Sequence, residues 1–423
     1  MDERVRATYW IETAFPLQQA AEVMAGEQST GTFLRVPGET DELRQAHAAR
    51  VESLVELDSV TTPSLPGAGV PKNLTGPPVY QRAEVTLSWP LSNMGLSLPN
   101  LLATMAGNLS ELKPFSGLKL LDVQFPAPFL TKYQGPQFAV PGTRRLTGVF
   151  DRPIIGTIIK PSVGLTPAAT AEMVDSLAEG GIDFIKDDEL QADGPHCPLE
   201  QRVREVMAVL NRHAEKNGRK VMYACNITGD IDEMLHRHDL VEAAGGTCVM
   251  VSMNSIGLPA LVALRRHSRL AIHGHRNGWG MLGRHPAIGM SYIAYQKFWR
   301  LAGVDHMHVN GLQNKFCEED SSVIASAREC LKPMFDVPGR GCEIMPVFSS
   351  GQSARQAPDT YRAIGTTDLI YACGGGIVAH PGGIAAGVRG IRQAWDAAVA
   401  GITLEEHARQ HPELRQALQK FAA

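Results

Sequence analysis

A lysine and three acidic residues follow one another in the segment GGIDFIKDDE, as Lys186, Asp187, Asp188 and Glu189. The apolar run before them is typical of a β-strand, on which alternate side chains share a face. We therefore expect Lys186 and Asp188 to project together, with Glu189 where the chain leaves the sheet. A lysine that has reacted with CO2 would add carbamate oxygens to these carboxylates, and Mg2+ prefers oxygen ligands. A structural ion pair or a solvated loop is the alternative interpretation.

Two histidine pairs form a second group of residues that could do chemistry. His273 and His275 lie two apart, as do His306 and His308, so each pair can place both rings on one face of a strand. Such pairs could form a zinc site, but the neighbouring acids and lysines suit Mg2+ better. For His273 and His306 we expect hydrogen-bonded positions in the core.

The segments that must position these residues alternate between two patterns after Ile154. Amphipathic segments such as TAEMVDSLAEGG end in Gly, as helices often do. Between them lie eight short apolar runs: IIGTIIK, GIDFIKDDE, VMYACNI, CVMVS, LAIHGH, HMHV, EIMPVFS and LIYACGG. Eight successive β/α units predict a TIM barrel, which carries its functional groups at the carboxyl ends of the strands. A doubly wound open sheet is the alternative and usually has fewer such units.

The ends of these predicted strands are polar. They carry Lys160, the Lys186 cluster, Asn226, His275, His308, Ser349 and the glycine run that begins at Gly374. The first part of the chain differs, because the runs ATYWIETAF and AEVTLSWP flank a helix-like segment from Leu17 to Met24. We therefore predict an α/β protein with a small N-terminal α+β domain, of the ferredoxin-like type, over residues 1–140 and a barrel over residues 141–423. The Pro-rich stretch FPAPFLTKYQGPQFAVPG suits a linker or a structured crossover.

Composition excludes several classes of partner. The net charge of −4 comes with no block of basic residues, which argues against nucleic acid and against an anionic membrane surface. The seven scattered cysteines include no C-x-x-C pair, and their odd number argues against a complete disulfide framework. No apolar segment of signal-peptide or membrane-spanning length follows Met1. We expect a cytoplasmic protein.

Read together, these motifs resemble the large subunit of RuBisCO and, more closely, the RuBisCO-like proteins that share its fold without fixing CO2. The resemblance extends over nearly the whole chain, with matching order and spacing. Its most specific pieces are GEQSTGTF, TMAGN, GTIIKPSVGL, GGIDFIKDDE, HGHRNG, DHMHVNGLQNKF, PVFSSG and CGGGIVAHPGG.

The resemblance implies a set of catalytic residues in the barrel, namely Lys160, Lys186, His275, His308 and Lys315. Lys186 would become carbamylated and bind Mg2+ together with Asp188 and Glu189. Lys160 matches the proton-transferring lysine of the family, and Lys315 matches the lysine of the mobile loop after the sixth barrel strand. A plain anion-binding role is the alternative for both of these lysines. His275 would lie beside the metal, and His308 would contact the substrate.

The resemblance also implies a set of residues that bind the substrate and its phosphate. These are Glu27, Thr32, Asn108, Arg276, Ser349, Gly351, Gly374, Gly375 and Gly376. The planar fork of Arg276 suits a phosphate or a carboxylate, and backbone N–H groups of a glycine run can approach a phosphate closely. In this family Glu27, Thr32 and Asn108 reach into the active site of the neighbouring subunit, which implies a homodimer with shared sites. Capping or turn roles are the alternative for Thr32 and Asn108.

Three positions depart from the RuBisCO pattern. This chain has Ser162, Phe33 and Trp279 where RuBisCO has lysine, tryptophan and histidine. These changes remove groups that would hold a second phosphate, so activity with ribulose bisphosphate is not expected. The remaining residues suit a substrate with a phosphate at one end and a ketone or carboxylate bound to the metal.

Two branches of RuBisCO-like enzymes act on such substrates. One acts on 3-oxo-isoapionate 4-phosphate, either as a decarboxylase or as a transcarboxylase/hydrolase that gives 3-phosphoglycerate and glycolate. The other is an enolase or isomerase of methylthio-sugar phosphates in methionine salvage, and its enolases have a lysine base where this chain has Asn108. We therefore predict the first activity, through an enediolate stabilised by Mg2+. A non-catalytic sugar-phosphate-binding protein is the third interpretation.

Overall fold

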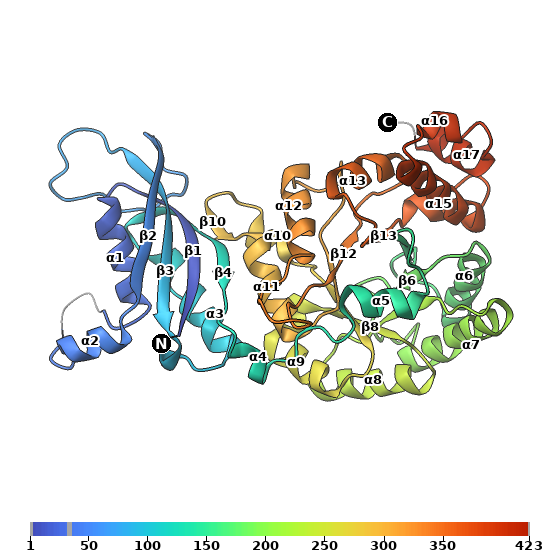
Figure 1. Cartoon of the computed structure of the whole chain (residues 1–423), viewed down its shortest axis with the longest axis horizontal. Coiled ribbons are helices and arrows are strands. Elements are labelled where there is room, and N and C mark those ends of the chain that lie inside the picture. The colour runs from blue at the N-terminus through green and yellow to red at the C-terminus, as the bar shows by residue number, and fades with distance from the viewer. Residues whose placement is uncertain (1–2, 32–35, 422–423) are drawn as a thin grey trace. The chain divides into compact units, whose positions relative to one another are not determined.

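The computed structural model describes residues 3–31 and 36–421, and these form two compact units (Figure 1). The first unit combines Met1–Tyr133 with two later segments, Gly278–Phe298 and Met334–Gly341. The second unit contains Gln134–Asn277, Trp299–Pro333 and Cys342–Ala423. The chain thus leaves the first unit before the predicted boundary at residue 140. Segments from beyond that boundary join the first unit because one of them adds a strand to its sheet.

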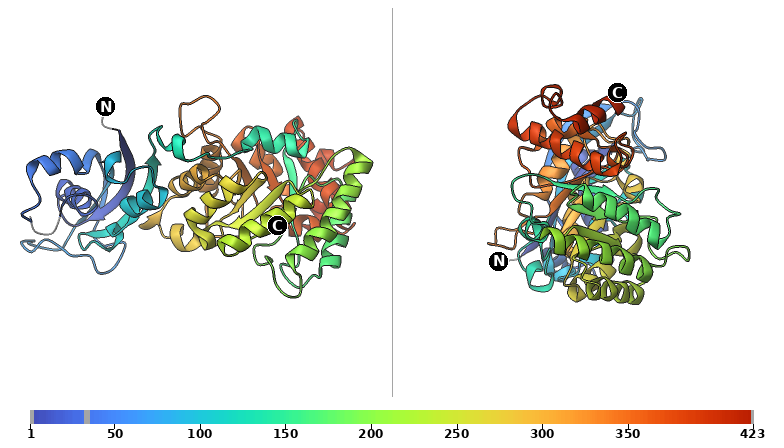
Figure 2. Two further views of the ribbon diagram at one scale, coloured as in Figure 1. Left: turned by 90° about the horizontal axis from the view of Figure 1, so that it is seen from below. Right: turned by 90° about the vertical axis from the view of Figure 1, so that its right-hand side faces the viewer.

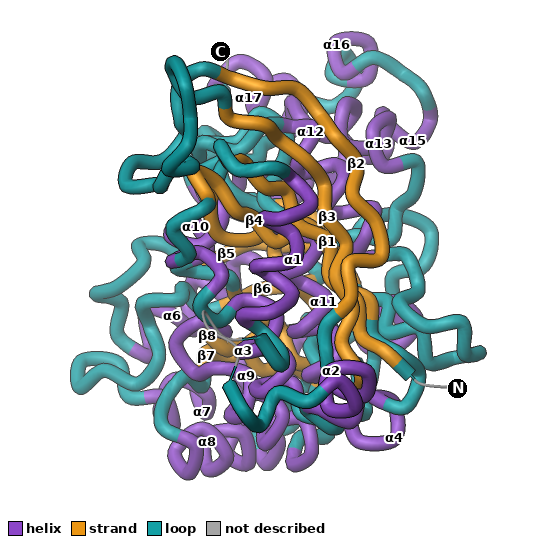
Figure 3. The backbone as a smooth tube through the Cα atoms, turned by 90° about the vertical axis from the view of Figure 1, so that its left-hand side faces the viewer, coloured by secondary structure: helices purple, strands orange, loops and turns teal. Residues whose placement is uncertain are grey.

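The first unit is built on a five-stranded sheet with the order β10-β4-β1-β3-β2 (Figure 3). Its strands are β1 (Arg4–Thr13), β2 (Arg50–Val60), β3 (Tyr80–Pro90), β4 (Phe115–Gln124) and β10 (Ile288–Met290). The first four pair antiparallel, and β10 lies parallel to β4. With α1 (Leu17–Glu27) and α3 (Leu98–Ala106), strands β1 to β4 follow the β-α-β-β-α-β order of ferredoxin-like domains.

The predicted elements of this unit are confirmed, but three of its strands, β2, β4 and β10, were missed. The runs ATYWIETAF and AEVTLSWP fall in β1 and β3, and the helix-like segment is α1. On β1 the alternate residues Val5, Ala7, Tyr9 and Ile11 are buried, as expected for a strand with one covered face. The sequence of β2 lacks the regular alternation of apolar and polar residues by which a half-buried strand is recognised. In agreement with this, no residue of β2 is buried.

The first unit also contains short helices. They are α2 (Asp41–His47), η1 (Leu91–Asn93), η2 (Leu109–Glu111), α4 (Phe129–Lys132) and, in the later segment Gly278–Phe298, α10 (Trp279–Gly283). The Pro-rich stretch contains α4 and the first residues of α5 (Ala139–Thr147). It is therefore a structured crossover.

The second unit is a closed barrel of eight parallel strands, as predicted. They are β5 (Ile154–Ile158), β6 (Phe184–Lys186), β7 (Met222–Asn226), β8 (Cys248–Ser252), β9 (Ala271–His275), β11 (His306–His308), β12 (Met345–Phe348) and β13 (Ile370–Ala372). Each falls within one of the eight apolar runs, and β13 pairs with β5 to close the ring. Interior residues such as Phe184, Met222, Met250 and Val347 form one buried core.

Helices surround this barrel (Figure 2). They are α6 (Pro167–Glu179), α7 (Leu199–Asn217), α8 (Ile231–Ala243), α9 (Met253–His267), α11 (Tyr292–Ala302), α12 (Asp320–Cys330), α13 (Ala357–Ile364), α14 (Gly375–Val378), α15 (Ile384–Ala400), α16 (Leu404–His407) and α17 (Pro412–Lys420), with η3 (Ala354–Gln356). The sequence explains their ends: Thr166 caps α6 by accepting from the N–H of Ala169, and Gly218 ends α7 in the left-handed conformation that favours glycine.

Two further features of the chain bear on its environment. All seven cysteines are free, and all but Cys317 are buried. In the described part of the chain, no helix has both the length and the apolar character needed to cross a bilayer.

Candidate active site

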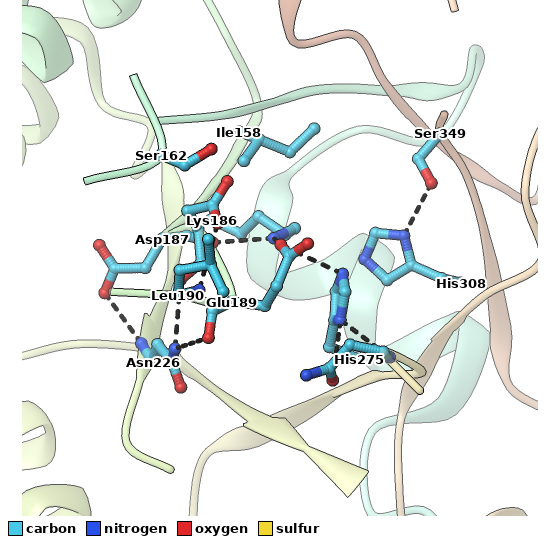
Figure 4. A network of polar contacts seen from close by, with 12 residues as sticks. Ile158, Ser162, Lys186, Asp187, Glu189, Leu190, Asn226, His275, His308 and Ser349 are labelled. Carbon is cyan, nitrogen blue, oxygen red and sulfur yellow. Dashed lines mark hydrogen bonds and ion pairs between the residues drawn. The ribbon is translucent and has the colours of Figure 1, made fainter. Parts of the chain in front are cut away.

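The polar residues predicted at strand ends lie at one rim of the barrel (Figure 4). β6 ends at Lys186, β7 at Asn226, β9 at His275 and β11 at His308, and Ser349 directly follows β12. The carboxyl ends of all strands in a parallel barrel meet at the same rim. Residues that are far apart in the sequence are thereby brought into one site.

Lys186 is the last residue of β6, and its side chain is 1% exposed. Its Nζ donates to the carbonyl of Asp187 at 2.8 Å and lies 3.3 Å from Oε2 of Glu189. The next residues form a turn, in which the N–H of Gln191 donates to the carbonyl of Asp188. Although β6 ends at Lys186, Lys186 pairs with Glu189, and the carboxylate of Asp188 is close enough to act on the charge of Lys186.

Asp188 connects this turn to Lys160. Its Oδ2 accepts from Lys160 Nζ at 2.7 Å, and its Oδ1 accepts from the N–H of Leu190 at 3.1 Å. Lys160 Nζ also donates to Ser162 Oγ at 2.7 Å. The residue that replaces the lysine of the RuBisCO pattern thus fixes the position of Lys160 next to a predicted metal ligand.

Asp187 faces away from this cluster, into a buried network that the sequence analysis missed. Its carboxylate accepts from Tyr223 at 2.5 Å, from the N–H of Asn226 at 2.9 Å and from Arg202 at 3.2 Å. Arg202 and Asp187 are each 1% exposed. Arg202 stands among the apolar residues of α7, next to Val203; an arginine on the buried face of an amphipathic helix was the signal that could have revealed a buried acidic partner.

Asn226 holds the backbone of the acidic turn. Its Nδ2 donates to the carbonyls of Asp188 and Glu189, at 3.1 and 3.2 Å. Its Oδ1 accepts from the hydroxyl of Thr228 at 2.7 Å. Asn226 is fully buried, so both its NH2 group and its carbonyl oxygen need hydrogen-bond partners, and only this orientation of the amide provides them. The two carboxylates predicted to bind metal are therefore positioned by strand β7.

Burial and the neighbouring charges shift the pKa values of the groups in this cluster. Burial lowers the pKa of Lys186, although the nearby carboxylates of Glu189 and Asp188 oppose that shift. Burial alone would raise the pKa of Glu189, but the charges of His275 and Lys186 lower it to about 2. Burial and the charge of Lys186 lower the pKa of His275 to about 4. At neutral pH, Glu189 is a carboxylate and His275 is neutral.

His308 lies between two hydrogen-bond partners. Its Nε2 is 2.8 Å from Nε2 of His273, and its Nδ1 is 2.9 Å from Oγ of Ser349. Burial lowers the pKa of His308 well below its usual value, so the ring is neutral at pH 7. His275 packs edge-on against it at 4.6 Å between ring centroids. His306 instead bonds Thr143 at 2.8 Å inside the core, which agrees with the core interpretation of His273 and His306.

Lys315 lies in an exposed loop after β11. The loop rests on the turn after β12, because the N–H of Lys315 donates to the carbonyl of Ser350 at 3.2 Å. Gly351 in that turn has φ +91°, a backbone conformation that favours glycine. Lys315 Nζ lies over the ring of Phe316, 5.2 Å from its centroid. This structure thus places Lys315 beside Gly351.

The glycine run follows β13 and lies beside Lys160. A methyl group added at Gly374 would come within 3.8 Å of Lys160 Cε and of Ile158. A methyl group at Gly376 would lie 2.4 Å from the carbonyl of Gln352, so no larger residue fits there. Gly375 has open space around it. The run therefore brings backbone to the rim of the barrel near Lys160.

Arg276 has a carboxylate partner that the sequence analysis missed. Its Nη2 is 2.9 Å from Oε2 of Glu318, and the same carboxylate accepts from the amide of Asn310. Nothing in the local pattern identified Glu318, because the two residues are separated by 42 positions.

Two of the predicted residues of the first unit, Glu27 and Asn108, fall in its described part. Glu27 ends α1, Asn108 precedes η2, and both are exposed. The side chain of Gln28, which follows Glu27, lies against the turn before Asn108: with its amide turned over, it donates to the carbonyl of Thr104 at 3.1 Å and accepts from the N–H of Asn108 at 2.9 Å. Thr32 and Phe33 lie outside the described residues. Trp279 packs against Tyr292 and Tyr295 within this unit.

Comparisons with known proteins agree with this arrangement. Residues 2–129 match the ribulose bisphosphate carboxylase large chain, N-terminal domain, and residues 139–421 match its catalytic domain. The chain is 56% identical over 418 residues to a 3-oxo-isoapionate-4-phosphate transcarboxylase/hydrolase from Xanthobacter autotrophicus, covering 99% of both chains. It is 46% identical over 420 residues to a 3-oxo-isoapionate-4-phosphate decarboxylase from Rhizobium etli, again covering 99% of both. The crystal structure of a rubisco-like protein from Burkholderia fungorum matches all of both chains, with 47% identity and a TM-score of 0.91.

The barrel, its polar rim and the ferredoxin-like domain define an α/β-barrel enzyme. The chain belongs to the RuBisCO large-chain family, and within it to the RuBisCO-like proteins. The resemblance seen in the sequence is therefore confirmed.

Proposed function

We propose that this enzyme decarboxylates a phosphorylated 3-oxo sugar acid, with 3-oxo-isoapionate 4-phosphate as its substrate. The observation that carries the proposal is the cluster in which Lys160 binds Asp188 at 2.7 Å while Lys186 lies 3.3 Å from Glu189. The relatives named for this substrate, at 56% and 46% identity, support it. When a 3-oxo acid loses CO2, the electron pair of the breaking C–C bond passes to the ketone, and a 2-hydroxy group makes the product an enediolate.

Mg2+ held by Asp188, Glu189 and a carbamate on Lys186 is the proposed cofactor. As an ammonium ion Lys186 would repel a divalent cation, but burial lowers its pKa and so favours the neutral amine that reacts with CO2. In that reaction the amine nitrogen bonds to the carbon of CO2 and loses a proton, which leaves an anionic carbamate. The resulting set of oxygen donors fits Mg2+.

A third ligand is needed at this cluster. Among residues 3–31 and 36–421, the side chains of His, Cys, Asp and Glu bring three possible ligand atoms close together only at His238, Asp239 and His267, on α8 and α9. No such group includes Asp188 and Glu189, although His275 Nε2 lies 3.4 Å from Oε2 of Glu189; a carbamate on Lys186 would add an oxygen ligand to the two carboxylates.

The chain's own residues have separable tasks in this proposal. Bound Mg2+ would stabilise the oxyanion charge that develops on the substrate. Lys160, fixed by Asp188 and Ser162, would move the proton that quenches the enediolate. The neutral His308 would position a substrate hydroxyl together with Ser349, and Lys315 would cover the site. The glycine run at Gly374 would hold the phosphate through backbone N–H groups.

The test is a 13C and 31P NMR time course of the purified protein with Mg2+, bicarbonate and 3-oxo-isoapionate 4-phosphate. One phosphorylated product plus CO2 would establish a decarboxylase. Formation of 3-phosphoglycerate and glycolate would establish the longer route, in which the enediolate recaptures CO2 and water cleaves the product. Absence of turnover would overturn the proposal and favour methylthio-sugar phosphates, or a non-catalytic role, as the next candidates.

We also propose a homodimer in which Glu27, Thr32 and Asn108 complete the partner's site. The contact of Gln28, the neighbour of Glu27, with the backbone of Asn108 and the exposure of Glu27 and Asn108 support a common surface for these two residues. Mixing the Asn108→Ala and Lys186→Met variants should restore activity, because one of the two sites in a mixed dimer would then contain both native residues. Mixed dimers, verified by differential tags, that remain inactive would contradict shared sites.

A further inference from the structure

The guanidinium of Arg276 is already paired with an anion from the chain itself. Arg276 Nη2 lies 2.9 Å from Oε2 of Glu318, and the side chains are only 8% and 15% exposed. The two side chains form an ion pair. The residue expected from the family pattern to bind a phosphate or carboxylate of the substrate therefore pairs with a carboxylate of the chain itself.

Both oxygens of the Glu318 carboxylate are held. Oε2 accepts from Arg276 and from the amide of Asn310. Oε1 accepts from the hydroxyl of Ser322 at 2.9 Å. A guanidinium, an amide and a hydroxyl that converge on one carboxylate are the kind of donors that bind a ligand oxyanion. Glu318 thus occupies, from within the chain, an anion-binding position.

This position is continuous with the candidate active site. Asn310 accepts from the hydroxyl of Ser350 at 2.8 Å, and its carbonyl accepts from the N–H of Ser349 at 3.3 Å. Ser349 in turn bonds His308 at 2.9 Å, and burial keeps His308 neutral. The end of the site around His308, Ser349 and Arg276 therefore has hydroxyl, imidazole and amide groups but no uncompensated positive charge among these residues.

We propose that Glu318 is a specificity-determining residue that restricts the site to substrates with a single phosphate. The phosphate binds at the glycine run, and the part of the substrate that meets Ser349 and His308 carries no second phosphate. A second phosphate near Arg276 would face the like charge of Glu318, or would have to displace a carboxylate held by three donors. This inference deepens the proposed function, on which it rests for the placement of the phosphate at the glycine run.

The test compares binding of ribulose 1,5-bisphosphate and ribulose 5-phosphate by isothermal titration calorimetry, with Mg2+ and bicarbonate present. The wild-type protein should bind the bisphosphate no more tightly than the monophosphate. Glu318→Gln removes the carboxylate that pairs with Arg276 and should shift the affinity ratio toward the bisphosphate by about tenfold or more, as expected when a like charge beside a phosphate is removed. Glu318→Ala, which also removes the side chain, should shift the ratio in the same direction.

Two controls separate charge at Arg276 from other effects. Glu319→Gln removes the same charge from the next residue, which is exposed and makes no side-chain cap hydrogen bond, and should leave the ratio unchanged. Arg276→Gln combined with Glu318→Gln should abolish the gain.

A wild-type preference for the bisphosphate would overturn the proposal. An unchanged ratio in both folded Glu318 variants, or no bisphosphate binding by them, would overturn it too. Because these probes are measured by binding alone, failure here is distinct from a failure of the enzyme to turn over the sugar acid.

Discussion

Replacing Lys186 by Met should lower kcat by about a thousandfold or more, since the proposed Mg2+ site would be lost and with it the stabilisation of the oxyanion. Methionine fills a similar buried volume but cannot form a carbamate, so the cluster would keep Asp188 and Glu189 without the third oxygen ligand. The barrel should stay folded, because the substitution removes a buried amine whose pKa is already lowered by burial.

The measurement is steady-state turnover together with a 13C NMR spectrum recorded in 13C-labelled bicarbonate. Wild-type protein should show a carbamate resonance that Lys186→Met lacks. Lys160→Met is the matched control: it should lose turnover but keep the carbamate signal, because Lys160 is 39% exposed and pairs with Asp188 without forming the carbamate. Full activity in Lys186→Met would rule out the carbamate mechanism.

The second large effect is expected from Arg202→Met. Asp187 and Arg202 are both buried, and removing one partner of a buried ion pair typically costs about 3–5 kcal/mol because the other charge is left uncompensated. Asp187 stands between Lys186 and Asp188 in the chain, so its displacement should also disturb the catalytic cluster. We expect a lower free energy of unfolding and a loss of turnover in the same variant.

Urea unfolding followed by circular dichroism measures the stability change. Arg212→Met on the same helix is the control, since Arg212 pairs with Asp175 at 2.9 Å while 61% exposed; an exposed pair of this kind contributes about 1 kcal/mol or less. Equal losses in the two variants would show that burial of the Asp187 pair has no special role.

The sequence by itself determined the barrel and the residues at its rim. Eight apolar runs separated by amphipathic segments define the strands locally, because strand and helix periodicities are properties of short windows. Since parallel strands of a barrel end at one rim, the polar residues that close those runs had to gather there. The same reasoning missed β2, whose residues lack a buried face.

Only the tertiary structure decided which charges pair within that rim. Lys186 meets Glu189, Asp188 meets Lys160 across 28 positions, and Glu318 meets Arg276 across 42. These pairings depend on where β6 ends and on how side chains from different strands and loops reach one another, which no local pattern records. The alternation of apolar and polar residues can assign a residue to a strand end. The residue with which it forms an ion pair depends on how segments distant in the chain pack together.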